Sequence, residues 1–178
     1  LAQTDFLTQV FKRSAIVHRL EEELSRSARS KAPLAVYRLD VDHFKLINDN
    51  FGHAAGDQVL IEVARRLKEQ SRNYDVTGRY GGEEFCCNLP ETDLNRAAVI
   101  AERCRRTVEE NLFHSQGIAV HIPISLGVAQ VADEIDTPEK LLDQADQALY
   151  AAKKGGRNRV ILSGTPVENR SAPDKVPA

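Results

Sequence analysis

Apolar residues recur along this chain with two spacings that alternate from one segment to the next. From Ser14 to Arg29 they lie three or four positions apart, which is typical of one buried helix face. The same spacing predicts helices over 54–70, 94–112 and 138–154. Runs that are continuously apolar, or that alternate with polar residues, predict strands over 34–39, 75–80, 85–89, 118–128 and 159–162. Strands interleaved with helices in this way indicate a layered α/β or α+β domain.

The last residues differ from the rest. From Ser163 to Ala178 the sequence is polar, rich in Pro and Ser, and without a period. We therefore expect one domain over 1–162 and a flexible tail over 163–178. Because the chain contains no Met, we also expect it to be part of a longer protein whose upstream region is missing here.

The composition bounds the possible functions. Lys and Arg number 24 against 26 Asp and Glu, a net charge of −2, which argues against a protein that neutralises many phosphates of duplex nucleic acid. No apolar stretch approaches the roughly 18 to 20 residues of a membrane-spanning helix, so we expect a soluble, cytoplasmic fragment with no membrane segment. The three cysteines, two of them adjacent, do not form a disulfide framework and fit a reducing compartment.

Two acidic clusters lie at edges of predicted structure. Asp40 and Asp42 follow a buried strand, and Glu83 and Glu84 follow two glycines in a predicted hairpin turn. Brought together, carboxylates from a strand end and a turn make an oxygen-rich site suited to Mg²⁺ and a phosphate-bearing substrate. The alternative for each cluster alone is that acids at such places are simply solvated.

Two further segments suit a phosphate ligand. The turn from His43 to Lys45 connects a strand to the next helix, so its amide groups suit an anion. Lys153 and Arg157 flank two glycines at a predicted helix end and suit the distal phosphates of a nucleotide. The alternative is structural, because cations at a helix C-terminus also complement the helix dipole, and without other evidence this alternative is favoured.

Several separated motifs, taken together, resemble the GGDEF family of diguanylate cyclases. They are DVDHFKLIND at 40–49, FGH at 51–53, GD at 56–57, RYGGEEF at 79–85, ISLGVA at 124–129, ALYAAK at 148–153 and GRN at 156–158. These motifs occur in the same order as in the family, and the resemblance covers the chain from about Asp5 to Leu162. The resemblance implies a palm-type, nucleotide cyclase-like α+β fold, with a central, mainly antiparallel five-stranded sheet flanked by helices.

The resemblance also implies an activity. Family members condense two GTP molecules into cyclic di-GMP and release two pyrophosphates, by metal-assisted attack of a ribose 3′-hydroxyl on the α-phosphate between two facing domains, so a homodimer is implied. By similarity, two Mg²⁺ or Mn²⁺ ions per GTP site would be held by Asp40, the Val41 carbonyl, Glu83 and Glu84. Glu84 would serve as a ligand or as the base for the 3′-hydroxyl. The GTP-binding residues would be Phe44 and Lys45 at the phosphates, Lys153 and Arg157 at the terminal phosphates, and Asn48 and Asp57 at the guanine.

An RxxD motif at 72–75 matches the family's product-inhibition site. Arginine donates to guanine O6 and N7, and a carboxylate accepts from the amino group of the base, so Arg72 and Asp75 suit a bound cyclic di-GMP. Arg103 on the following helix would supply a second arginine. The alternative is a solvated helix end, and the spacing to the hairpin favours the inhibitory site.

Two other functions compete with the cyclase. A catalytically silent domain that binds GTP or cyclic di-GMP as a receptor would be expected to lack an acid at Asp40, Glu83 or Glu84, and all three are present. A structural dimerisation module would not explain why these three acids are all present. The main departure from the family lies at Gln9, Val10 and Lys12, and it concerns the coupling to an upstream sensory or regulatory domain.

Overall fold

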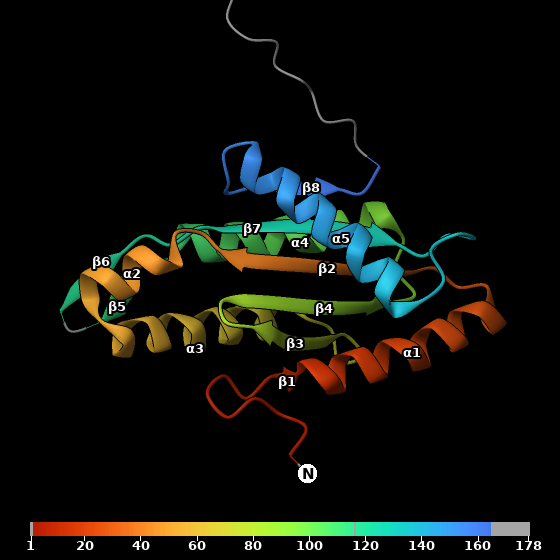
Figure 1. The fold of residues 1–178 in the computed structure, drawn as a ribbon, viewed down its shortest axis with the longest axis horizontal. Coiled ribbons are helices and arrows are strands. Elements are labelled where there is room, and N and C mark those ends of the chain that lie inside the picture. The colour runs from red at the N-terminus through yellow and green to blue at the C-terminus, as the bar shows by residue number, and fades with distance from the viewer. Residues whose placement is uncertain (1, 116, 165–178) are drawn as a thin grey trace, which may run out of the picture.

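The central element of the fold is strand β2, all of whose residues are buried. It lies in the middle of a six-stranded sheet in a computed structural model that describes residues 2–115 and 117–164 (Figure 1). It pairs antiparallel with β4 on one side and with β7 on the other. The strands, in their order across the sheet, are β1 (Phe11–Lys12), β3 (Val76–Gly81), β4 (Glu84–Pro90), β2 (Leu34–Val41), β7 (Ile124–Gln130) and β8 (Val160–Leu162).

The predicted α+β class with a mainly antiparallel sheet is confirmed, with one strand more than expected. Only the edge pairs β1–β3 and β7–β8 are parallel. The additional strand, β1, has two residues. A period cannot be detected over so short a segment, so no hydrophobic pattern could have indicated it.

The single strand predicted over 118–128 is wrong. Its first part, β6 (Ile118–Val120), pairs with β5 (Phe113–Ser115) in a separate two-stranded sheet, and its last part is β7. Pro123 lies between them and has no N–H to donate to a ladder. The alternation of apolar residues persists through the break because Ile122 is buried in the core without belonging to a strand.

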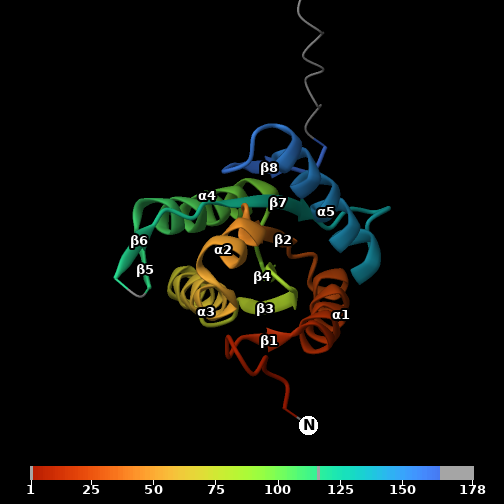
Figure 2. The same ribbon diagram turned by 60° about the vertical axis from the view of Figure 1, so that its left-hand side comes forward.

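Helices cover both faces of the sheet. Figure 2 shows α1 (Arg13–Ser30) and α5 (Pro138–Lys154) on one side, and α3 (His53–Gln70) and α4 (Leu94–Glu110) on the other. These four helices were predicted within a few residues. The helix α2 (Phe44–Phe51) was not, because the pattern was interpreted as a turn leading to one helix.

The side chains of β2 alternate between two cores. Odd-numbered residues from 35 to 41 belong to the core beneath α3 and α4, whereas Leu34 and Val36 belong to the core beneath α1 and α5. The next two residues on the α1–α5 face are Arg38 and Asp40, which are polar yet only 6% and 8% exposed. One face of the central strand therefore changes from apolar to charged before the strand ends.

Three other expectations concern the whole chain. The cysteines Cys86, Cys87 and Cys104 are all buried and free. Within the described ranges, no helix combines the length and apolar character needed to cross a membrane. The division into a domain over 1–162 and a tail over 163–178 stays a prediction, since residues 165–178 lie outside the described part.

Candidate active site

The end of β2 lies against the turn of the β3–β4 hairpin. Asp40 is the register partner of Glu84 across the β2–β4 pair. The Val41 N–H donates a hydrogen bond of 3.2 Å to the Glu83 carbonyl oxygen, which fastens the strand end to the turn. Register partners present their side chains on the same face, about 5 Å apart at Cβ. Pairing of β2 with β4 therefore brings the two predicted acidic clusters together.

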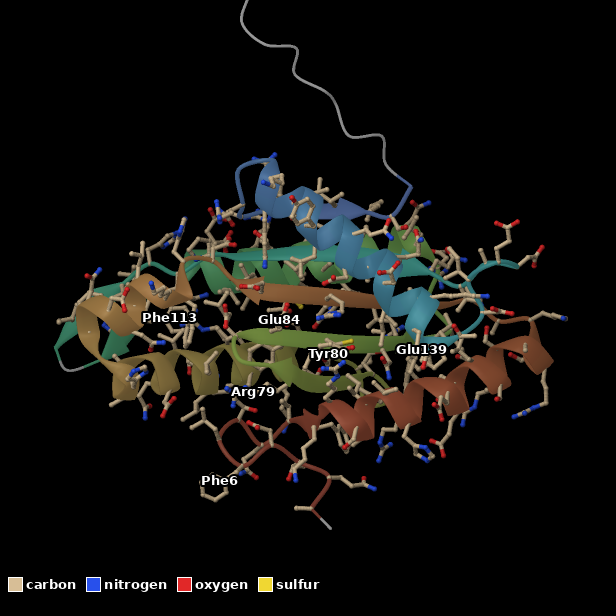
Figure 3. All side chains as sticks on the ribbon, in the orientation of Figure 1. Phe6, Arg79, Tyr80, Glu84, Phe113 and Glu139 are labelled. Atoms are coloured by element: carbon tan, nitrogen blue, oxygen red, sulfur yellow. The ribbon has the colours of Figure 1, made fainter. Side chains whose placement is uncertain are left out.

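The hairpin turn contains one glycine with an unusual backbone conformation. Gly82 has φ of +20°, a backbone angle that residues with a Cβ adopt rarely. Glu83 and Glu84 follow directly, and both are half-buried. In Figure 3, Glu84 lies near the middle of the sheet, on the side facing the viewer with α1 and α5.

Asp40 has an unusual charge environment. Lys153 at the end of α5 donates a hydrogen bond of 2.6 Å to Oδ2 of Asp40. Burial raises the pKa of Asp40 to about 6; Lys153 opposes this increase, and the nearby Glu83 and Glu84 carboxylates add to it. A buried carboxylate that repels its neighbours and relies on one ammonium group is a site for additional positive charge.

Asp42 belongs to the acidic cluster that was predicted to suit Mg²⁺, but in the structure its carboxylate is hydrogen-bonded to other parts of the chain. Its carboxylate accepts hydrogen bonds from Ser125 Oγ at 2.7 Å and from the Asn158 N–H at 3.0 Å. Arg157 and Asn158 have φ of +63° and +45°, so this loop reverses sharply after α5. Burial raises the pKa of Asp42, and these two hydrogen bonds oppose the increase. Asp42 therefore anchors the loop that carries Arg157.

The residues expected at the guanine meet where α2 joins α3. Asn48 lies directly over Gly56, where a Cβ would come within 1.9 Å of Asn48 Oδ1 and 3.2 Å of the Phe44 ring. Only glycine permits this approach. Asp57 is exposed near the start of α3, directly after Gly56, and Lys45 is exposed at the start of α2. The structure thus places Asn48 and Asp57 at one corner and Lys153 with Asp40 at the strand end.

The donor set at the strand end fits Mg²⁺ or Mn²⁺. Over residues 2–115 and 117–164, no three His, Cys, Asp or Glu side chains are gathered as a metal cage. The site instead offers the carboxylates of Asp40, Glu83 and Glu84 at two adjoining strand ends, together with main-chain oxygens. Mg²⁺ in proteins is held in just this way, by one or two carboxylates while substrate phosphates and water complete its shell.

The RxxD segment forms a closed pair. The Arg72 guanidinium donates to both oxygens of Asp75, at 2.8 Å for the shortest contact, and also to Thr92 Oγ1 at 2.6 Å. The Asp75 side chain has no exposed surface, so the alternative of a solvated helix end does not describe it. Arg103 donates to the Gln70 carbonyl oxygen at 2.8 Å, close to the start of this segment. The structure therefore brings the second arginine near the motif.

Two features of the site were missed by the sequence reasoning. The first is Arg38, a buried charged residue two positions before Asp40, which lies 3.6 Å from Glu84. The feature of the sequence that could have indicated it is a charged residue inside an apolar run. Asp5 accepts from Arg79 at 3.2 Å and so ties the N-terminal segment to the hairpin. Nearby, Gln9 has φ of +59°, a backbone conformation that glycine adopts more readily than residues with a Cβ.

Comparisons with known proteins identify the class. A family model described as "Diguanylate cyclase, GGDEF domain" matches residues 2–159. Diguanylate cyclase A of Treponema denticola is 40% identical over 166 residues, 92% of this chain and 45% of that protein. Response regulator PleD of Caulobacter vibrioides is 43% identical over 164 residues, 90% of this chain and 36% of that protein.

Solved structures agree. The GGDEF domain of DgcB from Caulobacter crescentus, in complex with c-di-GMP, superposes with a TM-score of 0.89 at 32% identity over 93% of this chain and 95% of that one. The active GGEEF domain of a diguanylate cyclase from Vibrio cholerae gives 0.83 at 34% identity, over 89% and 100%. The fold is thus that of a GGDEF domain. The chain belongs to the GGDEF family, and it spans less than half the length of these curated relatives.

Proposed function

We propose that this domain is a diguanylate cyclase, which condenses two GTP molecules into cyclic di-GMP and releases two pyrophosphates. The observation that carries the proposal is the register between Asp40 and Glu84, with Lys153 hydrogen-bonded to Asp40. Phosphoryl transfer needs mainly positioning and neutralisation of charge, and carboxylates that hold cations beside a lysine supply both.

The acids at the strand end would hold the metal. Asp40, the Val41 carbonyl, Glu83 and Glu84 would bind two Mg²⁺ or Mn²⁺ ions for each GTP. Bound there, the ions would neutralise phosphate charge and favour ionisation of the ribose 3′-hydroxyl that attacks the α-phosphate. Lys153, which the metal would release from Asp40, and the exposed Arg157 would then hold the terminal phosphates.

The α2–α3 corner would hold the rest of the nucleotide. Asn48 and Asp57 would bind the edge of the guanine, and Phe44 and Lys45 at the start of α2 would lie against the phosphates. An amide and a carboxylate complement the O6 acceptor and the amino donors of guanine. Each domain would bring one GTP, and two copies of this chain would face each other, so turnover requires a homodimer.

Arg72, Asp75 and Arg103 would form an inhibitory site for the product. The Arg72–Asp75 pair is preorganised by its mutual hydrogen bonds, and Arg103 lies near it. A silent receptor that binds cyclic di-GMP through these residues without turnover is the second candidate, which the same residues support.

One assay distinguishes these functions. The purified chain, at high concentration or fused to a dimerising coiled coil, is incubated with GTP and Mg²⁺, and nucleotides and pyrophosphate are separated by chromatography. Cyclic di-GMP formed by the wild type and not by Glu83→Ala, whose circular dichroism spectrum is unchanged, supports the cyclase. Copurified cyclic di-GMP without new synthesis in the forced dimer supports the receptor, and neither product nor bound nucleotide rejects both.

A further inference from the structure

Arg38 is a buried cation that the proposed reaction has not yet used. It lies on the same face of β2 as Asp40, two residues earlier, and is 6% exposed. Its Nη2 lies 3.6 Å from Oε2 of Glu84 on the hairpin, and its Nη1 lies 3.7 Å from Oδ1 of Asp146 on α5. The guanidinium therefore forms ion pairs with both the β3–β4 hairpin and α5, next to the candidate metal site.

Packing around Arg38 restricts where its guanidinium can lie. The carbon Cζ lies 3.7 Å from the centroid of the Tyr80 ring, a close cation–π contact. On the other side, α5 approaches β7 closely at Gly127, where a Cβ would be 2.1 Å from the Ala145 carbonyl oxygen. Gly127 is also the β7 partner of Arg38. This close approach brings Asp146 of α5 to Arg38.

The burial of Arg38 has a cost that only its acidic neighbours offset. Its Nε is inaccessible to solvent and has no hydrogen-bond partner among the described residues. Removing a guanidinium from water costs several kcal/mol unless opposite charges are close. A leucine in this apolar run would need no such compensation, whereas the Arg38 guanidinium depends on the carboxylates of Glu84 and Asp146, at 3.6 and 3.7 Å.

Two cations therefore contact different carboxylates of the acidic site. Lys153 binds Asp40 and is one-third exposed, so a bound metal can displace it into solvent. Arg38 pairs with Glu84, is only 6% exposed and lies against the Tyr80 ring, so it is less free to leave its carboxylate than Lys153 is. A carboxylate held by a fixed cation keeps its orientation when its acidic neighbours repel it.

We propose that Arg38 is a positioning residue that holds the Glu84 carboxylate in the orientation needed to bind the metal. The inference rests on the proposed function, since it assigns Arg38 to the same site. Groups that orient a metal ligand typically contribute 10- to 100-fold to metal affinity or activity. We expect Arg38→Met to lower kcat by about that factor, to change the KM for GTP less than about threefold, and to be partly restored by Arg38→Lys.

The matched control is Arg13→Met. The Arg13 guanidinium also lies over the Tyr80 ring, at 4.3 Å, and it borders with Arg38 the same cleft of about 810 Å³ between α1 and α5. Figure 3 shows Tyr80 between these two helices. Arg13 has no ion pair with Glu84 among the described contacts, so its replacement should leave kcat within about twofold of the wild type.

A double-mutant cycle on metal affinity gives a readout independent of turnover. Mn²⁺ binding is followed by electron paramagnetic resonance with an α-thio analogue of GTP bound. Arg38→Met should weaken Mn²⁺ binding roughly tenfold in the wild-type background and less than about twofold with Glu84→Gln, because Arg38 acts through that carboxylate. Where Arg38→Met does not fold, Arg38→Gln replaces it in the same cycle.

Three results would overturn the assignment. A folded Arg38→Met enzyme with wild-type kcat and Mn²⁺ affinity would exclude a positioning role. An equal loss in both backgrounds, or an equal loss in Arg13→Met, would show that Arg38 acts through general packing. A wild-type protein that neither turns over GTP as a forced dimer nor binds Mn²⁺ would reject the proposed function itself, which the first two results leave standing.

Discussion

The ammonium group of Lys153 lies 2.6 Å from the carboxylate of Asp40, although the two residues are 113 positions apart in the chain. The fold creates this contact by ending α5 above the end of β2. Without metal, the lysine supplies the positive charge that the buried aspartate requires. The negative charge of the Asp40 carboxylate can therefore be neutralised by Lys153, by a proton or by a metal ion. Competition among these three for the carboxylate predicts how the site responds to pH and Mg²⁺.

Activity at limiting Mg²⁺ should fall as the pH decreases through about 6. The pKa of Asp40 is raised to about 6, chiefly by burial, so below that pH the proton competes with the metal for the carboxylate. Cyclic di-GMP synthesis measured from pH 5 to 8, below the half-saturating Mg²⁺ concentration, should show this midpoint. Saturating Mg²⁺ should move the midpoint to lower pH; a midpoint that does not depend on Mg²⁺ would contradict the competition.

Asp40→Asn should abolish turnover and stabilise the fold at neutral pH. The folded-state pKa of about 6 exceeds the ordinary value of 3.8, so the folded state keeps its proton to higher pH than the unfolded state. The wild type consequently loses stability as the pH rises from about 4 to about 6. The free energy of unfolding of Asp40→Asn at pH 7.5 should exceed that of the wild type by about 1 to 3 kcal/mol.

Denaturant titrations at two pH values provide the check on Asp40→Asn. The difference from the wild type should disappear near pH 4, where the aspartate is protonated in the folded state. A variant that is less stable than the wild type at pH 7.5 would show that the contact with Lys153 outweighs the cost of burial.

Gly56→Ala should weaken GTP binding while the fold remains. A Cβ at this position would lie 1.9 Å from Asn48 Oδ1, so the Asn48 side chain must move away from its place at the α2–α3 corner. We expect the KM for GTP to rise about tenfold, which corresponds to about 1.4 kcal/mol, with a smaller change in kcat. An unchanged KM together with an unchanged melting temperature would remove Asn48 from the guanine site.

Arg103→Ala is a cleaner test of product inhibition than Arg72→Ala. Arg72 neutralises a carboxylate, Asp75, that has no exposed surface, so its removal leaves an unpaired buried charge that costs about 3 to 5 kcal/mol. Arg103 is exposed and bonds a single carbonyl oxygen, that of Gln70. Both substitutions should raise the final yield of cyclic di-GMP, but only Arg72→Ala should lower the melting temperature.

Progress curves at rising concentrations of added cyclic di-GMP measure the effect. In Arg103→Ala the concentration that halves the initial rate should rise several-fold. If added product inhibits this variant as strongly as the wild type, Arg103 is not part of the inhibitory site.

Long periodic segments could be predicted from the sequence, whereas short ones could not. Helices α1, α3, α4 and α5 are 17 or 18 residues long, and each carries an apolar stripe that contributes buried residues in the structure. The helix α2 has only eight residues, too few for its spacing of Phe44, Ile47 and Phe51 to stand out. The strand over 118–128 was wrong because burial of Ile122 continued the alternation across Pro123.

By itself, the sequence determined which residue types lie at the ends of elements: acids at the end of β2 and in the hairpin, and basic residues at the end of α5 and just beyond it. That information is local, because it depends on the period of the pattern and on the glycines of a turn. Only the tertiary structure decided which ends meet. A pattern of alternation assigns a residue to a face without naming the neighbouring strand, so the pairing of Asp40 with Glu84, the contact with Lys153 and the burial of Arg38 beneath them follow from packing between distant segments.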